Sequence, residues 1–351
     1  QGNRFDAWVS SATVVLPDGK TIAVSKGHFL DGTLATKKSV GEIEFTAAGE
    51  TAAILSLLDH EPLKLIRGFG LDPASIGGTG KIDTRLSLPL IKDVSIDEVD
   101  FSGKARAEAI TIPEIRKGLA VTAGALDIAV SKTGLKATGT VGLNGIPPLD
   151  IVWTEGFVAS KGPGSVYRLS GSLDDAAREA LGLDINDFVS GPVQINATLT
   201  GKGADVSDAV IHADFLDSVL KADYLGWWKP AGKAASGDLK LSMKGGTARI
   251  SDLVLAGEEI DVKGGFTIGA DDRLVAADLP VLRLGSGNDL KIRAERGKSG
   301  ELAVEIGGPK ADARGLVRQL VSGSGEPEDR EASAKRMLTA EMLADPARRT
   351  N

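Results

Sequence analysis

Apolar and polar residues alternate in short stretches along most of the chain. In DLKLSMK (238–244), for example, Leu239, Leu241 and Met243 occupy every second position, with polar residues between them. Further stretches of this kind are TRLSLPL, ALDIAV, VQINATL and ELAVEI. Because successive side chains of a β-strand point to opposite faces, each stretch predicts a strand with one apolar and one polar face.

Turn-forming residues separate these stretches, as at Pro17-Asp18-Gly19, Gly77-Gly78 and Gly285-Ser286-Gly287. Strands that recur about every 8–12 residues with such turns between them predict antiparallel meanders, and hence a mainly β protein. The same alternation is typical of β-sandwiches, whose apolar faces close over a dry core. Periodicity alone therefore does not distinguish an open apolar groove from a closed core.

Three short helices are expected, at about 51–59, 172–182 and 311–321. The second is the clearest, because Ser172 is a suitable N-cap, acidic residues follow in the first turn, and Gly182 lies near the end. From Ser322 the chain becomes rich in Gly, Ser, Glu and other charged residues. This composition predicts a linker and a charged, loosely ordered tail over residues 323–351.

Composition narrows the possible functions. Of the 351 residues, 42% are apolar but only 4% are aromatic, so Val, Ile, Leu and Ala must fill the interior. Glycine, with 44 residues, is about one residue in eight and suits many turns and bulges. The formal net charge is −7 with both signs dispersed, and the absence of a basic block argues against nucleic-acid binding.

Membrane and redox signals are sparse in the sequence. There is no cysteine, which excludes disulfides and thiolate chemistry and fits an oxidising periplasm as well as a cytosol. No apolar run approaches the ~18–20 residues that a membrane-spanning helix needs, and no signal peptide is recognisable at the start. Because the chain opens at Gln1, we expect any membrane anchor to lie in a segment outside it.

No reaction centre emerges from the motifs. The Gly-Lys-Ser/Thr triplets at 19–21 and 297–299 lack the upstream glycine of a phosphate-binding loop. The three histidines are far apart in the sequence, His212 is expected to face solvent, and no metal site is predicted. We therefore predict no catalytic residues, no cofactor and no metal.

The sequence contains three acidic pairs, Asp174-Asp175, Glu258-Glu259 and Asp271-Asp272. Because glycan-cleaving enzymes use two carboxylates, these pairs make such an enzyme a possible function. Their positions favour ordinary roles, because the first opens a predicted helix and the others lie at predicted hairpin tips.

The pair Trp227-Trp228 is the most conspicuous local feature. Neighbouring side chains of a strand point to opposite faces, so one ring is expected on the apolar side and the other on an outer surface. A packing role next to the Lys229-Pro230 turn is the favoured interpretation, and contact with a partner is the alternative.

Three stretches together resemble the AsmA-like family, most closely the YhdP-type bridge-like lipid transfer proteins of bacterial envelopes. They are SLPLIKDVSIDEVDFSGKARAEA (87–109), GLKATGTVGLNGIPPLDIVWTEGF (134–157) and YLGWWKPAGKAASGDLKLSMKGG (224–246). The resemblance covers roughly residues 5–322, and the order of the three stretches is more specific than any one of them. The chain is much shorter than a full-length bridge and contains no membrane helix of its own.

The resemblance implies a long, strongly curved antiparallel β-sheet that forms an open, taco-like apolar groove, with a few short helices. It implies a β-groove segment over 1–158, an AsmA-like β-groove segment over 159–322 with a helix near 172–182, and the tail over 323–351. The implied function is binding and conducting phospholipids between membranes in the bacterial periplasm, attached to the inner membrane in the full-length protein. No catalytic residue is carried over, and the protein partners stay unknown.

The alternating stretches identify the side chains expected to line the groove. They are Leu86, Leu88, Leu126, Ile128, Val130, Val193, Ile195, Leu199, Leu239, Leu241, Met243, Ile260, Val262, Phe266, Ile268, Leu302 and Val304. The alternative for each is a contact in a closed core. In that case the chain would be a structural or interaction module, a β-sandwich or solenoid, instead of a lipid carrier.

Overall fold

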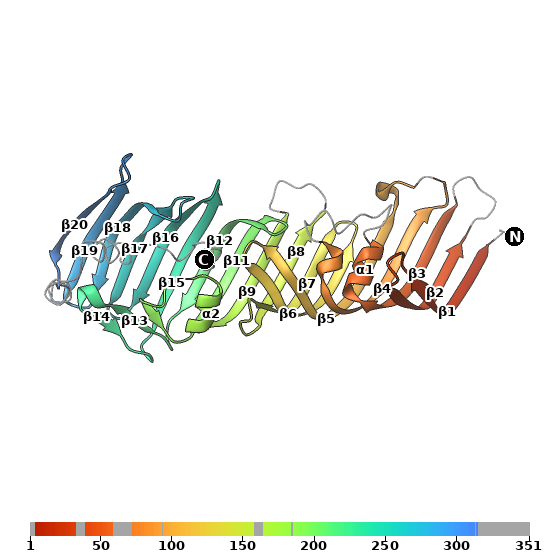
Figure 1. Ribbon diagram of the computed structural model, residues 1–351, viewed down its shortest axis with the longest axis horizontal. Coiled ribbons are helices and arrows are strands. Elements are labelled where there is room, and N and C mark those ends of the chain that lie inside the picture. The colour runs from red at the N-terminus through yellow and green to blue at the C-terminus, as the bar shows by residue number, and fades with distance from the viewer. Residues whose placement is uncertain are drawn as a thin grey trace. The chain divides into compact units, whose positions relative to one another are not determined.

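The computed structural model describes residues 4–32, 39–58, 72–92, 94–157, 164–183, 185–312 and 314. It confirms a mainly β protein with a large antiparallel sheet and few helices among these residues (Figure 1). Seventeen strands belong to one sheet, and a second sheet has three short strands. The predicted tail and nearly all of the helix expected at 311–321 lie outside the described residues.

The chain divides into two compact units, which are described separately below. Unit 1 comprises Gln1–Tyr167 and Gly201–Asp205, and unit 2 comprises Arg168–Thr200 and Val206–Asn351.

In unit 1, eight consecutive strands pair as an antiparallel meander (Figure 1). They are β1 (Phe5–Val15), β2 (Thr21–Asp31), β3 (Val40–Glu50), β4 (Gly77–Pro89), β5 (Asp100–Arg116), β6 (Leu119–Ser131), β7 (Gly134–Leu143) and β8 (Leu149–Gly156). Helix α1 (Thr51–Leu58) and the single turns η2 (Pro73–Ser75) and η3 (Ile96–Glu98) lie in the connections. Short connections join β1 to β2, β5 to β6, β6 to β7 and β7 to β8.

In unit 2, β15 (Ala235–Lys244) pairs with β12 (Asp205–Asp214) and begins a second meander. It continues through β16 (Thr247–Gly257), β17 (Ile260–Ile268), β18 (Leu274–Leu284), β19 (Asn288–Arg296) and β20 (Leu302–Lys310). β9 (Ser165–Leu173) pairs with β11 (Val193–Lys202). The small sheet consists of β10 (Val189–Ser190), β13 (Val219–Ala222) and β14 (Trp227–Lys229), with the turn η4 (Asp223–Leu225) before β14.

Helix α2 (Asp175–Ala180) occupies the predicted place but does not begin at the predicted cap. Ser172 belongs to strand β9, and Asp174 is the N-cap, its side chain accepting the amide N–H of Ala177 at 2.8 Å. The prediction of Ser172 was wrong because the backbone stays extended through Asp174, whose ψ is −178°. A cap must adjoin the first helical residue, whatever the propensity of residues further upstream.

Two short elements cover parts of the apolar sides of the sheet. In unit 1, Ala53 and Ile54 of α1 pack with Ile22, Ala47 and Ile82 of β2, β3 and β4. In unit 2, residues of the small sheet, including Val189 and Leu220, pack with side chains from β17, β18 and β19. Both covers bury aliphatic side chains that strand alternation places on one face.

Arg178 fixes the corner that carries the small sheet. Its side chain is 2% exposed and its guanidinium donates to the carbonyl oxygens of Leu173, Val189 and Gly191 at 2.8–3.1 Å. It also pairs with Asp175 in the first turn of α2. A buried cation that satisfies several backbone acceptors ties α2, β9 and β10 together.

Lys229 has a similar role at the end of β14. Its ammonium group donates to the carbonyl oxygens of Ser218, Pro230 and Lys233 at 2.7–2.9 Å. The residue is 4% exposed, and this burial lowers the pKa of the ammonium group below its usual value.

Candidate functional site

The strand registers show how the apolar side chains of unit 1 are arranged. Residues that lie opposite each other on neighbouring strands form rows perpendicular to the strands, and all side chains of one row point to the same face of the sheet. Four rows share the face that α1 partly covers. They run Ala7–Phe29–Ile43–Leu86–Phe101, then Phe45–Thr84–Gly103–Val130–Leu135–Glu155, then Ala12–Val24–Ala47–Ile82–Ala105–Ile128–Ala137–Trp153, and Val14–Ile22–Gly49–Gly80–Ala107–Leu126–Gly139–Ile151.

These rows are apolar with few exceptions. One of them crosses all eight strands, from Ala12 in β1 to Trp153 in β8, without a single polar side chain. The polar residues of the four rows are Thr84 and Glu155. One face of unit 1 is therefore a continuous apolar surface.

The strands of unit 2 repeat this arrangement. The longest row crosses seven strands, from Ala209 in β12 to Val304 in β20, and every member is apolar. Its members are Ala209, Leu241, Ile250, Phe266, Ala277, Ala294 and Val304. Two shorter rows are Ala213–Gly237–Leu255–Val262–Leu282–Leu290 and Met243–Ala248–Ile268–Leu274.

The structure places the predicted groove residues in three kinds of environment. Those placed in the rows are Leu86, Leu126, Ile128, Val130, Leu241, Met243, Val262, Phe266, Ile268 and Val304. Three more are placed by a single cross-strand neighbour or by a cluster. Leu88 lies opposite Gly41, Leu239 lies opposite Ile211, and Leu302 packs against the cluster that contains Ile268 and Leu274. Leu199 is half-buried in β11.

The third group lies beneath the small sheet. Val193 and Ile260 are 4% and 5% exposed and belong to the cluster that contains Val189 and Leu220, and Ile195 packs at its border. Their environment is that of a covered core. Leu126 and Ile128 are intermediate, since they pack at the border of a cluster that includes Ile76.

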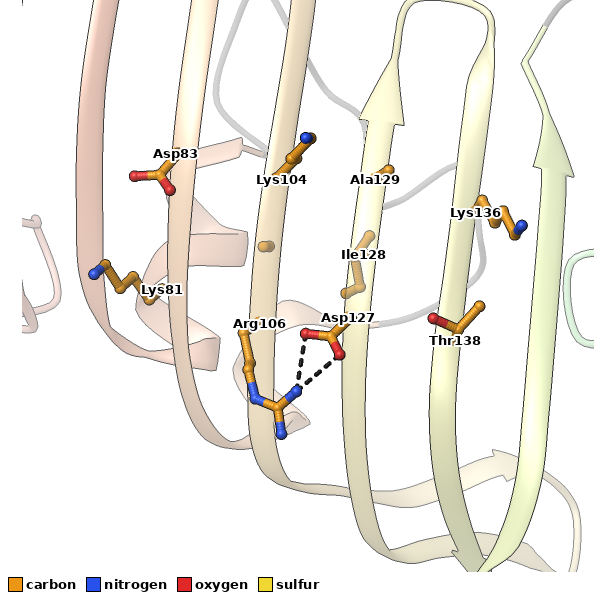
Figure 2. Close-up of a pocket in the computed structure, with 10 residues that line it drawn as sticks. Lys81, Asp83, Lys104, Arg106, Asp127, Ile128, Ala129, Lys136 and Thr138 are labelled. Carbon is orange, nitrogen blue, oxygen red and sulfur yellow. Dashed lines mark hydrogen bonds and ion pairs between the residues drawn. The ribbon is translucent and has the colours of Figure 1, made fainter.

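The opposite face of unit 1 is charged. A hollow of about 520 Å³ lies over β4, β5, β6 and β7 and is lined by Lys81, Asp83, Lys104, Arg106, Asp127, Lys136 and Thr138, together with Ala105, Ile128 and Ala129. Figure 2 shows the residues around it. Arg106 Nη1 donates to both carboxylate oxygens of Asp127 at 2.8 and 2.9 Å (Figure 2). The hollow is a solvated surface, because Arg106 and Asp127 are 56% and 62% exposed. The sheet of unit 1 thus has one apolar and one charged face.

The other sequence features keep structural roles. Asp174 and Asp175 open α2, and the pairs 258–259 and 271–272 lie in turns between strands, as predicted. His212 is exposed, as predicted, and pairs with Asp238 at 2.8 Å. Trp227 packs in the cluster under the small sheet while Trp228 is 63% exposed, so the two rings point to different environments.

The described residues contain no group of three or more His, Asp or Glu with the geometry of a metal site. Within the same part of the chain, no helix has the length and hydropathy that crossing a membrane requires.

The sequence pattern did not predict the polar residues at one edge of the apolar surface in unit 1. Trp153 Nε1 donates to Glu155 Oε2 at 3.2 Å, and the Trp153 ring stacks on Tyr167 with centroids 5.8 Å apart and planes 20° apart. Tyr167 in turn donates its hydroxyl to the carbonyl oxygen of Gly203 at 2.8 Å. The signal in the sequence is the alternate placement of Trp153 and Glu155 in IVWTEGF.

Comparisons of the chain with protein-family models, with curated proteins and with solved structures find no match. The resemblance to the AsmA-like family therefore rests on the three sequence stretches and on the strand pattern.

Proposed function

We propose that the apolar face of the sheet binds the acyl chains of phospholipids, and that the chain is a lipid-conducting module of an intermembrane lipid transfer protein. The single observation that carries this proposal is the run of apolar rows across eight strands in unit 1 and seven in unit 2. The resemblance to AsmA-like proteins supports it and suggests the bacterial periplasm, with inner-membrane attachment through a segment outside this chain.

The energetics of acyl-chain transfer suit such a surface. Moving a methylene group from water to apolar surroundings is favourable by about 0.8 kcal/mol, and the effect has no directional requirement. A row of Val, Ile, Leu, Ala and Gly side chains offers similar contacts at each strand, so a lipid can shift along the surface with little change in energy. The mechanism is passive sliding, and no catalytic step is part of it.

A second candidate function is a structural or interaction module with a closed core. The observation that favours it is the covering of part of each apolar face, by α1 in unit 1 and by the small sheet in unit 2. In this case the remaining apolar surface would also be covered, by a protein partner, and would hold no lipid.

The two candidates differ in what the purified protein carries. Detergent-free protein is extracted with organic solvent and the extract is examined by mass spectrometry. Stoichiometric phospholipid supports the lipid-conducting function. A folded protein that carries no lipid and takes up none from vesicles favours the structural module.

Substitutions on the two faces locate the binding surface. Leu241→Asp and Val262→Asp, made separately, place a charge in an apolar row, and each should abolish lipid loading while β content by circular dichroism is kept. The matched controls are Ser242→Asp and Lys263→Asp, which place the same charge on the adjacent residue, facing the other side of the same strand. Lipid loading that survives both row substitutions would contradict the assignment of this face.

A further inference from the structure

Glu155 is a charged residue on the otherwise apolar face of unit 1. It is the one charged residue in the four rows, where its neighbours across β7 and β6 are Leu135 and Val130. The side chain is half-buried, and no cation among the described residues forms an ion pair with it. Placing a carboxylate on apolar surroundings without a counter-charge is costly, so its presence calls for a reason.

Hydrogen bonding to Trp153 does not supply that reason. The indole N–H needs one acceptor, and Glu155 Oε2 provides it at 3.2 Å. The neutral amide oxygen of a glutamine would satisfy the indole equally well and would avoid the cost of the charge. The negative charge is therefore more than the fold of this corner requires.

Two aromatic rings stand beside the carboxylate. Trp153 lies in the adjacent row of the same strand, and Tyr167 of β9 stacks on it. Tyr167 is held by its hydrogen bond to Gly203, whose N–H donates to the fully buried Ser165 hydroxyl at 2.6 Å. Burial raises the pKa of Tyr167, a hydrogen bond from Ser165 lowers it in part, and the negative charge of Glu155 raises it further.

The position of this group within the sheet is also informative. Glu155 is the penultimate residue of β8, and its partner Leu135 is the second residue of β7. The carboxylate thus lies where the apolar face ends at the strand termini, while Ile151 and Leu126 continue the apolar surface inward. A lipid whose chains lie on the rows would bring its headgroup to such a border.

We propose that Glu155, Trp153 and Tyr167 form a headgroup site for phospholipids that carry an ammonium group. This inference rests on the proposed lipid-binding function. The ammonium group would donate hydrogen bonds to the Glu155 carboxylate and approach the electron-rich faces of the two rings, the combination by which proteins recognise alkylammonium ligands. An anionic headgroup without an amine would be repelled by the same carboxylate, so the site selects among lipids with equal acyl chains.

The test measures headgroup selection by the full chain. Purified protein is incubated with vesicles that contain phosphatidylethanolamine and phosphatidylglycerol in equal amounts, with identical acyl chains. The protein is then separated from the vesicles, and the lipid bound to it is quantified by mass spectrometry. Wild-type protein should be enriched in phosphatidylethanolamine roughly two- to fivefold, the range expected for a partly exposed ion pair. Glu155→Gln should bind the same total lipid at the ratio of the vesicles, and Glu155→Lys should favour phosphatidylglycerol.

The matched control is Asp150→Asn, which removes one negative charge from the same strand on the opposite face, where Asp150 pairs with Thr140. It should keep the wild-type ratio. Glu155→Gln retains an acceptor for Trp153, and an unchanged melting temperature confirms that the corner is intact.

The outcomes separate this inference from the function on which it rests. Lipid bound by wild-type protein at the vesicle ratio, or an enrichment that persists in Glu155→Gln, overturns the headgroup site and leaves lipid binding standing. Protein that binds neither lipid overturns the proposed function, and the headgroup site falls with it.

Discussion

The two units carry the same kind of apolar rows but cover them with different chemistry. In unit 1 the cover is one short helix, held by small aliphatic side chains such as Ala53 and Ile54. The hydroxyl of Thr51 at its start is buried and has no hydrogen-bond partner among the described residues. In unit 2 the cover is the small sheet, held at its ends by Arg178 and Lys229, whose charged groups donate to backbone carbonyl oxygens.

This difference indicates different strengths of attachment. A helix of eight residues is marginal without tertiary contacts, and α1 gains these from a few aliphatic side chains. Removing a buried cation leaves several hydrogen-bond acceptors without a donor at the same time. The contacts that hold the small sheet are therefore expected to break together. We therefore expect α1 to open locally and the small sheet to open together with the strands around it.

The largest expected effect is at Arg178. Arg178→Met keeps the volume but leaves the carbonyl oxygens of Leu173, Val189 and Gly191 without their donor. We expect a loss of about 3–5 kcal/mol in the free energy of unfolding, measured by urea denaturation with circular dichroism. Arg283→Met, which removes a 56% exposed guanidinium from β18, should leave the midpoint unchanged. Equal midpoints for both variants would show that Arg178 does not hold the corner.

A smaller and more local effect is expected at α1. Ile54→Ala removes a side chain that is 7% exposed, at a cost of about 2–4 kcal/mol. Amide hydrogen exchange should accelerate in α1 while the strands of unit 2 keep their protection. Ser56→Ala, on the same helix, serves as the control and should leave the exchange rates near those of the wild type. Acceleration throughout unit 1 would mean that the helix and the sheet open as one.

The smallest effect concerns the ionisation of Tyr167. Because burial raises the pKa of Tyr167, the folded protein keeps a proton above pH ~10 that the unfolded chain releases. Stability should therefore fall as the pH rises above ~10, and this slope should be smaller in Tyr167→Phe. The chain has 2 tyrosines, so ultraviolet titration of wild type and Tyr167→Phe isolates the Tyr167 step. In Glu155→Gln that step should move to lower pH, and an unmoved step would contradict the electrostatic link between the two side chains.

Much of the fold could be predicted from alternation and turns. Alternation predicts a strand with Leu239, Leu241 and Met243 on one face, and β15 is that strand. Alternation fails in β16, where Ile250 and Leu255 both join apolar rows although their numbers differ by five. The register shifts between Ile250 and Leu253, and Asp252 has φ of 52°, which indicates a β-bulge. An extra residue of this kind depends on tertiary pairing and leaves little trace in a local pattern.

The proposed headgroup site could not be predicted from the sequence for a related reason. Trp153 and Glu155 are visible at alternate positions of one strand, but nothing local distinguishes that glutamate from a solvent-exposed one. Its neighbours Leu135 and Val130 come from other strands, and Tyr167 comes from β9. Only the register across β6, β7 and β8 shows that the carboxylate lies on the apolar side.

The bulge at Asp252 also determines which kinds of mutation the gene can tolerate. Because Asp252 is the extra residue of the bulge, its loss would restore simple alternation and keep Leu253 and Leu255 on the apolar side. Loss of a residue from a regular stretch, such as Ser242 in β15, would instead turn Met243 and the residue after it to the opposite faces. Sequence variation in these strands should therefore accumulate through exchanges of residues, with length changes confined to the turns and to bulges of this kind.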